Sequence, residues 1–457
     1  MSEKTRADVV ISLEKRLTIV REEARNEPSA TPCFIFRVPQ NLRLQLSPGD
    51  DTAYIPEVVS IGPYHAGNDC LRGMDYHKTR ALNSVLTRTN QPLAYYLDPM
   101  YELEQNARKC YHGEVDMTYT TFVEMMLLDG CFMLEIIRGH NTGFDQLGYS
   151  PNDPVFTIRG YNNMASLIIK DMIKLENQIP FFVLEKLFDL QESRRTSGQL
   201  AQLASAMFIK WLTGEKLEVD HLKGKFLHCL NVFQYSLLLS IGDGLEDIQL
   251  LEPSMTQSNN PTDQHEFFYS ASDLIEYGIK LKRPKKVKRP FWDIKWKSNG
   301  VLEIPRIFIN NRFKVVFQNL VTFEQQCRKR NQLRPVITEY VTLMDKLIKS
   351  GTDVGHLHQA GIIVHQLRSD AEVASLFNEL GKLAFVDPRV TSHYTGLYQQ
   401  LNEHCNRWNH WKSELKMTYF GNPWAMASLF AAIVLLFLAF FQTFYTVYPY
   451  YWPPSRY

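Results

Sequence analysis

The chain has 457 residues, of which 45% are hydrophobic and 22% are charged, a balance typical of folded proteins and unlike that of disordered or collagen-like chains. Its 50 Lys and Arg residues nearly equal its 49 Asp and Glu residues, and the resulting net charge of +1 argues against a protein that coats nucleic acid. The seven cysteines are scattered and form no CxxC pair, so neither a disulfide framework nor a cysteine-rich zinc module is indicated.

Residues 1–30 are predicted to contain a short amphipathic helix. Apolar residues recur at helical spacing from Val9 to Val20, among charged residues. This segment lacks the apolar core of a signal peptide. Prolines and glycines then interrupt the chain as far as Pro63, which predicts a more irregular region before the first long helices.

Residues 31–416 are predicted to form one large α-rich body, with two lobes that meet near residues 242–267 as the alternative. The apolar stretches 119–138 and 164–189 are interpreted as buried helices. Pro180 should divide the second stretch into a helix that ends near Asn177 and another that begins at about Pro180. The spacing of apolar residues predicts further helices at 197–212, 220–239, 313–330, 335–349, 353–367, 370–380 and 391–416.

The ends of the helix at 370–380 carry local signals. Ser369 and Glu372 have the spacing of a capping box, and Gly381 is expected just past the last turn.

A small two- or three-stranded sheet is predicted within the helical body. Apolar and polar residues alternate at 278–282, 291–296 and 301–305, as in half-buried strands. The polar, turn-rich stretch 242–267 is interpreted as a flexible surface loop.

The C-terminal part of the chain predicts a transmembrane helix at 424–447, followed by a short tail at 448–457. No charged side chain occurs from Met417 to Ser455. About 20 apolar residues at 1.5 Å rise each suffice to cross the ~30 Å hydrocarbon layer of a bilayer. Tyr and Trp residues flank the apolar centre on both sides, as in the aromatic belts of membrane helices.

The charges around this helix predict its orientation. Arg407, Lys412 and Lys416 precede the apolar segment, whereas only Arg456 follows it. Because basic residues are enriched on the cytoplasmic side, the body is expected in the cytoplasm and the tail on the other side. The sequence therefore predicts a single-pass, tail-anchored membrane protein.

Short phrases along most of the chain resemble one plant family, the domain-of-unknown-function family two-four-seven, which is an uncharacterised plant membrane protein family. They are FRVP at 36–39, YIPEVVSIGPYH at 54–65, MDYHK at 74–78, LLDGCF at 127–132, DMIKLENQIP at 171–180, VLEIP at 301–305, NL at 319–320, FE at 323–324, YVTLMDKLI at 340–348 and YFGNPW at 419–424. The resemblance implies a membrane-associated protein without an established enzymatic activity. Some grass members of the family are associated with self-incompatibility, a cell-recognition process.

One phrase permits a hydrolase hypothesis. Ser60 precedes His65 and is followed further on by His77, so a serine nucleophile with a histidine base is an alternative. The Gly-x-Ser-x-Gly elbow that exposes such a serine is missing. Gly62 and Pro63 are therefore interpreted as a turn, and the structural reading is preferred.

Several polar side chains lie in apolar stretches: Asp129, Glu135, Asp171, Glu176, Asn177 and Gln178. Buried carboxylates require partners, and an acid–base pair or a metal site would be the functional interpretation. A di-iron helical bundle would need Glu-x-x-His motifs, and neither stretch has one. We prefer a structural network, with Arg37, Lys78 or Arg80 as candidate partners.

The histidines do not predict a metal site. His356, His358 and His365 cluster near Asp353, and two more, His404 and His410, lie near Cys405, but neither group has the spacing of a known zinc motif.

The basic run at 282–289 has six Lys or Arg residues. A solvated loop is the preferred reading, contact with anionic lipid the second, and a nuclear-import or nucleic-acid patch the third.

The sequence thus predicts a mainly α protein that is membrane-anchored and non-enzymatic, and that acts in protein recognition or signalling, with self-incompatibility as one setting. The alternative is a membrane-tethered hydrolase that uses Ser60 with His65 or His77. We expect the lipid bilayer and an unidentified protein as partners. No cofactor, metal, small-molecule substrate or nucleic acid is expected.

Overall fold

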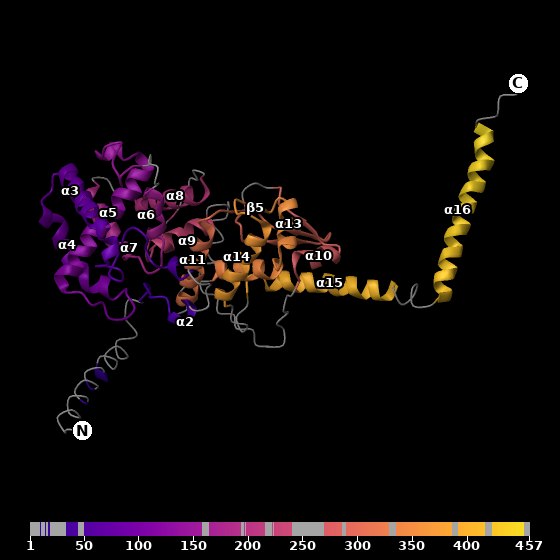
Figure 1. Cartoon of the computed structure of the whole chain (residues 1–457), viewed down its shortest axis with the longest axis horizontal. Coiled ribbons are helices and arrows are strands. Elements are labelled where there is room, and N and C mark those ends of the chain that lie inside the picture. Colours follow the sequence, from indigo (N-terminus) through magenta and orange to yellow (C-terminus); the bar gives the residue numbers. More distant parts are fainter. Residues whose placement is uncertain are drawn as a thin grey trace.

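The computed structural model shows a mainly α-helical chain (Figure 1). The residues it describes are 10, 14, 17–18, 33–43, 50–157, 164–192, 196, 198–214, 222, 224–239, 269–285, 289–328, 335–385, 392–415 and 423–451. The predicted N-terminal helix within 1–30, apart from three short pieces, and the loop 242–267 lie outside these residues.

Helix α5 (Tyr119–Thr142) is the centre of the N-terminal half and is buried along most of its length. Four helices pack against it: α3 (Asp75–Thr89), α4 (Leu93–Arg108), α7 (Phe181–Gln191) and α8 (Gln199–Thr213). Gly130 allows α7 to approach closely, because a Cβ atom at this position would lie 2.3 Å from Leu187 Cδ1. The absence of a side chain on Gly130 therefore sets the distance between α5 and α7.

Shorter elements complete this half. They are helices α2 (Gln40–Arg43), α6 (Met164–Met172) and α9 (Cys229–Leu239), and the 3₁₀ turns Asp50–Ala53, Asp69–Met74 and Asp145–Leu147. Helix α9 packs beside α8.

The C-terminal half of the body is built around α11 (Phe313–Arg328), which packs against α12 (Val336–Leu347) and α14 (Asp370–Leu383). Helix α13 (Gly351–Gln359) packs on α14, and α10 (Ala271–Glu276) packs on α13. Helix α15 (Thr395–Leu415) follows, and α16 (Pro423–Tyr451) is the last element. Apolar side chains of both halves of the body form one continuous core.

Two small sheets lie in the C-terminal half. In the first, β3 (Val301–Glu303) is central, parallel to β1 (Lys280–Lys282) and antiparallel to β2 (Lys295–Lys297). In the second, β4 (Ile307–Ile309) pairs in parallel with β5 (Ile363–His365). The small sheet, predicted with two or three strands, is confirmed and has three, whereas the β4–β5 pair was not predicted.

Most predicted helices are present, with two differences in the second half of the chain. The helix predicted at 353–367 ends at Gln359, because Gly361 takes a left-handed φ of 69° and the following residues pair with β4. Gly381 is a residue of α14, which continues to Leu383 instead of ending before the glycine. The Ser369 cap is confirmed, since its hydroxyl accepts the Glu372 N–H at 3.2 Å.

Two other helices differ from prediction in the N-terminal half. The first helix of the 164–189 stretch ends at Met172, five residues earlier than the predicted end. The helix expected at 220–239 begins only at Cys229. Helices α3 and α4 were not predicted.

Candidate functional sites

The most extensive polar feature is a buried clamp, in which side chains of residues 129 and 171–178 hold the backbone of residues 57–62. The Asp171 carboxylate accepts the N–H groups of Glu57, Val58 and Val59 at 2.7–3.0 Å. Lys174, which has no exposed side-chain surface, lies 3.1 Å from the same carboxylate. A loop with no sheet partner thus has its donors satisfied by a buried anion, as buried backbone groups require.

The rest of the clamp continues along the same loop. Asn177 accepts the Ile61 N–H at 2.7 Å and donates to the Val59 carbonyl at 3.0 Å. Its amide also donates at 3.0 Å to the carbonyl of Asp171 in the last turn of α6. At Gly62, the N–H donates to Asp129 at 2.8 Å.

Lys78 links the clamp to helix α3. Its ammonium lies 2.6 Å from the Asp129 carboxylate and 3.3 Å from the Ser60 hydroxyl. Burial raises the pKa of Asp129, and the contacts with Lys78 and the Gly62 N–H act in the opposite direction. Both partners are buried, and Lys78 also lies 3.7 Å from Asp75, so removing Lys78 would leave the Asp129 carboxyl buried without its cationic partner.

Glu176 binds a second set of partners at the edge of the clamp. It accepts the guanidinium of Arg43 at 2.6 Å and the Val38 N–H, and His65 Nε2 lies 3.4 Å away. Burial acts to raise the pKa of Glu176, but the contacts with His65, Arg43 and the Val38 N–H outweigh it and leave that pKa below its ordinary value.

The other buried carboxylates of this half are also paired. Arg88 contacts Glu135, which accepts the Tyr149 hydroxyl at 2.9 Å. Arg80 pairs with Asp153. The predicted network is therefore present, with Lys78 as predicted. Arg43 and Arg88 supply charges that the sequence did not suggest, while the Arg37 guanidinium stacks 4.7 Å over the Tyr64 ring.

The three residues of the hydrolase hypothesis lie in this network, with different partners. Ser60 is buried and contacts Lys78. His65 faces Glu176, and His77 Nδ1 lies 3.0 Å from Arg80. Burial and the neighbouring Arg80 lower the pKa of His77.

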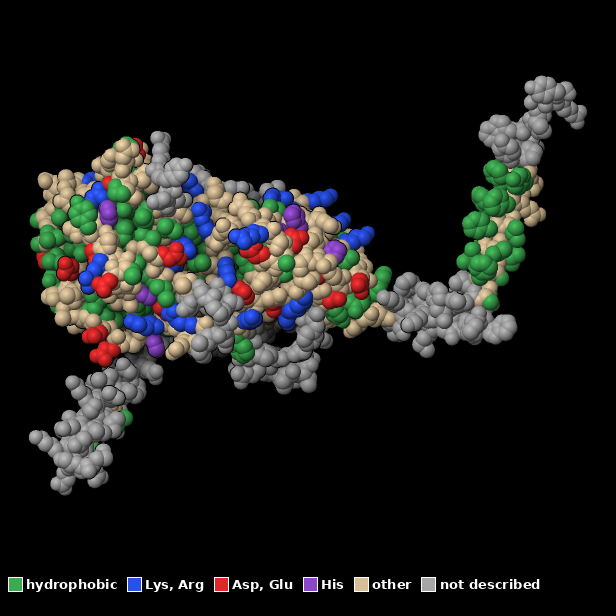
Figure 2. All heavy atoms as spheres, in the orientation of Figure 1, with side chains coloured by type: hydrophobic (Ala, Val, Ile, Leu, Met, Phe, Trp, Pro, Cys, Tyr) green, Lys and Arg blue, Asp and Glu red, His purple; other side chains and the backbone are tan. Residues whose placement is uncertain are grey.

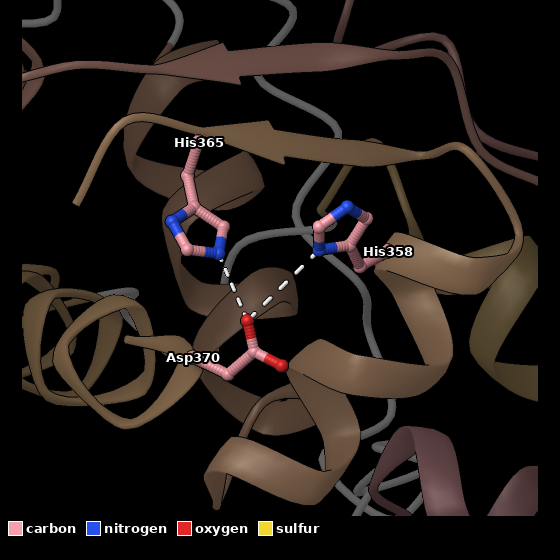
Figure 3. Close-up of side chains that lie close together, drawn as sticks. All are labelled: His358, His365 and Asp370. Carbon is pink, nitrogen blue, oxygen red and sulfur yellow. Dashed lines mark hydrogen bonds and ion pairs between the residues drawn. The ribbon is translucent and has the colours of Figure 1, made fainter. Parts of the chain in front are cut away.

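A second cluster joins His358, His365 and Asp370 (Figure 3). His358 lies in the last turn of α13, His365 ends β5 and Asp370 begins α14. Asp370 Oδ1 lies 2.8 Å from His365 Nε2 and 4.0 Å from His358 Nδ1. Asp353, the acidic residue near these histidines in the sequence, does not belong to this cluster. It caps the start of α13 and accepts the Ser272 hydroxyl at 2.6 Å.

The basic run at 282–289 begins in β1, where Lys282 belongs to a group of four exposed lysines on the three-stranded sheet, called here the lysine face. Lys280 and Lys282 of β1 are exposed, as are Lys295 and Lys297 of β2. Register places Lys280 and Lys297 beside Val301, and Lys282 and Lys295 beside Glu303, so the four lysines share one face. Figure 2 shows Lys and Arg side chains projecting at the end of the body that carries this sheet.

Arg289, the last residue of the basic run, forms ion pairs within the body and does not fit the interpretation of the run as a solvated loop. It pairs with Asp293 at 2.7 Å and with Glu303 at 3.0 Å. Residues 286–288 lie outside the described part of the chain.

Helix α16 contains the segment Phe430–Val447, which is long and apolar enough to cross a membrane. None of this segment is buried, and its side chains such as Leu436 and Phe437 are exposed. It lies within the predicted span at 424–447. The length and exposure of this apolar helix are weak evidence that it is a membrane anchor and not a core helix of a soluble protein.

Comparison with known proteins gives relatives along nearly the whole chain. The UPF0481 protein At3g47200 of Arabidopsis thaliana is 28% identical over 431 residues, covering 90% of this chain and 85% of the relative. The putative UPF0481 protein At3g02645 of the same plant is 24% identical over 533 aligned positions, covering 96% of this chain and 94% of the relative. No solved structure matches. The profile of the family DUF247, described as plant protein of unknown function, matches residues 35–438, and the chain belongs to that family.

Proposed function

We propose that this chain is a single-pass, tail-anchored membrane protein without enzymatic activity, whose cytoplasmic body recognises another protein. The observation that carries the anchor is α16, an unburied apolar helix that follows the folded body. Such a helix satisfies its own backbone hydrogen bonds in lipid, whereas in water it would expose a large apolar surface.

The lysine face of the three-stranded sheet supports a position beside an anionic membrane. The ring of Trp296 in β2 packs against His404 of α15, with 5.2 Å between centroids. The face therefore belongs to the part of the body from which the chain continues to α16. A basic side chain near an anionic bilayer contributes about 1 kcal/mol of attraction.

The partners of Ser60, His65 and His77 support a non-enzymatic body, because a serine hydrolase needs the hydroxyl beside its histidine base. Labelling of the full chain with a serine-reactive probe tests this directly. We expect no labelling that depends on Ser60. Labelling that disappears in Ser60→Ala would establish the hydrolase instead.

Membrane insertion is tested by alkaline carbonate extraction and flotation of the full-length protein. We expect the wild type to stay with the membrane and the double variant Leu436→Arg/Leu438→Arg to be released, since each central Arg costs about 2.5–3.5 kcal/mol of insertion free energy. The matched control is Leu93→Arg/Tyr95→Arg, at exposed apolar positions of α4, which should stay membrane-bound. Extraction of the wild type by carbonate would refute the anchor.

Protein recognition is tested by proximity labelling from the anchored protein in plant tissue. Reproducible labelling of a partner that is lost when the body is deleted but α16 is kept would support recognition by the body. Self-incompatibility is the narrower form of this proposal, and it requires that the partner come from the reproductive tissue. The supporting arguments are the membrane anchor and the resemblance to a family with members in that process.

A further inference from the structure

We propose that His358, His365 and Asp370 form a zinc-binding site in the C-terminal half of the body. The three side chains come from three different elements, the end of α13, the end of β5 and the first turn of α14, and converge on one point (Figure 3). Two imidazole nitrogens with one carboxylate oxygen are a ligand set that zinc uses where a fourth position remains open.

The distances suit a tetrahedral ion after small side-chain rotations. Zinc bonds of about 2.0–2.1 Å place neighbouring ligand atoms about 3.3 Å apart. Asp370 Oδ1 lies 2.8 Å from His365 Nε2 and 4.0 Å from His358 Nδ1, so one distance must lengthen and the other must shorten. The side chain of His358 is 55% exposed and is free to make the larger adjustment.

The fold fixes the backbone positions of the other two ligands. His365 has only 9% of its side chain exposed, and β5 is fixed by its pairing with β4. Asp370 follows the Ser369 cap of α14. Gly351 lets α13 approach the start of α14, because a Cβ atom there would lie 3.2 Å from the Ala371 nitrogen. His365 therefore needs little adjustment, whereas the side chains of His358 and of Asp370, which is 38% exposed, lose conformational freedom when the ion binds.

The hydrogen bonds of His365 bear on the expected zinc affinity of the site. His365 Nε2 donates its proton to Asp370 or shares it with that residue, and zinc would displace this proton to Nδ1. Among the described residues, His365 Nδ1 is buried without a hydrogen-bond partner, so the second contact that usually orients a zinc-bound imidazole is missing there. We therefore expect moderate affinity, below that of closed structural sites with four protein ligands.

Zinc binding is measured on the full chain without a histidine tag, purified in detergent, by competition with a colorimetric zinc indicator. Accessible thiols such as Cys70 are alkylated first, because they would bind zinc as well. We expect His358→Ala and Asp370→Asn each to weaken one zinc equivalent tenfold or more. His356→Ala is the matched control, because His356 lies on the same helix but outside the cluster, and it should bind as the wild type does.

Folding and ligand identity are checked separately. Thermal melting without zinc establishes that each variant is folded, and added zinc should raise the melting temperature of the wild type and of His356→Ala only. X-ray absorption of the zinc-loaded wild type should show nitrogen and oxygen ligands without sulfur. Equal zinc affinity of the wild type and the two ligand variants, or a sulfur-dominated spectrum, would overturn the proposal.

Discussion

Replacement of Asp171 by Asn isolates the contribution of the buried clamp to stability. The carboxylate accepts three backbone N–H groups and lies 3.1 Å from the fully buried Lys174. The Asn side chain has one acceptor oxygen and carries an NH₂ group that would face these donors. Lys174 keeps the Ile55 carbonyl at 2.6 Å and Glu57 at 3.1 Å, so its charge is only partly uncompensated.

The magnitude follows from counting what the substitution leaves unsatisfied. With one N–H still bonded, two donors lose their partner at about 1–3 kcal/mol each, so the free energy of unfolding should fall by roughly 2–6 kcal/mol, and the weakened Lys174 contact adds to this loss. At about 2 °C per kcal/mol for a large domain, the melting temperature should fall by roughly 4–12 °C.

The assay is thermal unfolding of the full chain in detergent, followed by near-ultraviolet circular dichroism. Asp98→Asn is the control, since Asp98 is an exposed residue of α4 and the substitution removes the same charge. It should change the melting temperature by no more than about 1 °C, corresponding to at most ~0.5 kcal/mol. A melting temperature of Asp171→Asn equal to that of the control would refute the clamp as a stabilising feature.

Two further predictions concern the same half of the molecule. Gly62 has φ of 75° and a Cβ there would lie 2.3 Å from the Gln178 carbonyl oxygen, whereas Gly67 has φ of 77° with open space around it. In urea unfolding, Gly67→Ala should lower the free energy of unfolding by about 1 kcal/mol, and Gly62→Ala should lower it by at least ~2 kcal/mol more. Equal losses for the two variants would contradict the close approach of Gly62 to Gln178. Burial lowers the pKa of His228 to about 3 in the folded protein. The unfolded chain therefore takes up a proton on His228 at a higher pH than the folded protein does. The stability that this histidine contributes is complete above the ordinary histidine pKa and is lost as the pH falls from there toward 3. At pH 5 this loss is about 2 kcal/mol, and His228→Asn should reduce the difference in urea stability between pH 7 and pH 5 by about that amount, whereas an unchanged difference would show that His228 does not titrate on unfolding.

The elements that the sequence predicted correctly are those whose signal is local. Helix α5 is buried on nearly all sides, so its continuous apolar run indicates a helix without any knowledge of its neighbours. The three-stranded sheet has Leu281 and Trp296 between exposed lysines, which gives the alternation of a half-buried sheet.

Other elements depend on distant contacts. Helix α3 buries only Lys78, Ala81 and Val85, and a lysine in place of an apolar residue hides the helical period. Strand β5 forms because β4 lies beside it, although the local pattern from Asp353 to Leu367 indicates a helix.

The candidate sites show the same division. Asp129, Asp171 and Glu176 could be recognised as buried acids because they interrupt apolar stretches. Lys78, the partner of Asp129, was among the predicted candidates, whereas Arg43 was not, since it is separated from Glu176 by 133 residues and no local pattern connects them. Asp370, by contrast, is only five residues from His365, and a search for carboxylates on the C-terminal side of that histidine would have included it.

The buried clamp also bears on where a partner would bind. The phrases at 54–65 and 171–180 hold each other through Asp171 and Asn177, so their polar groups are already occupied inside the body. A side chain that is satisfied internally offers a partner no free donor or acceptor, and its substitution changes stability before it changes recognition. Variants in these phrases should therefore lower the amount of folded protein, whereas variants that alter partner choice should lie at exposed positions. Exposed apolar residues such as Tyr76 of α3 and Tyr95 of α4 are the positions at which the proposed recognition can be examined without disturbing the core.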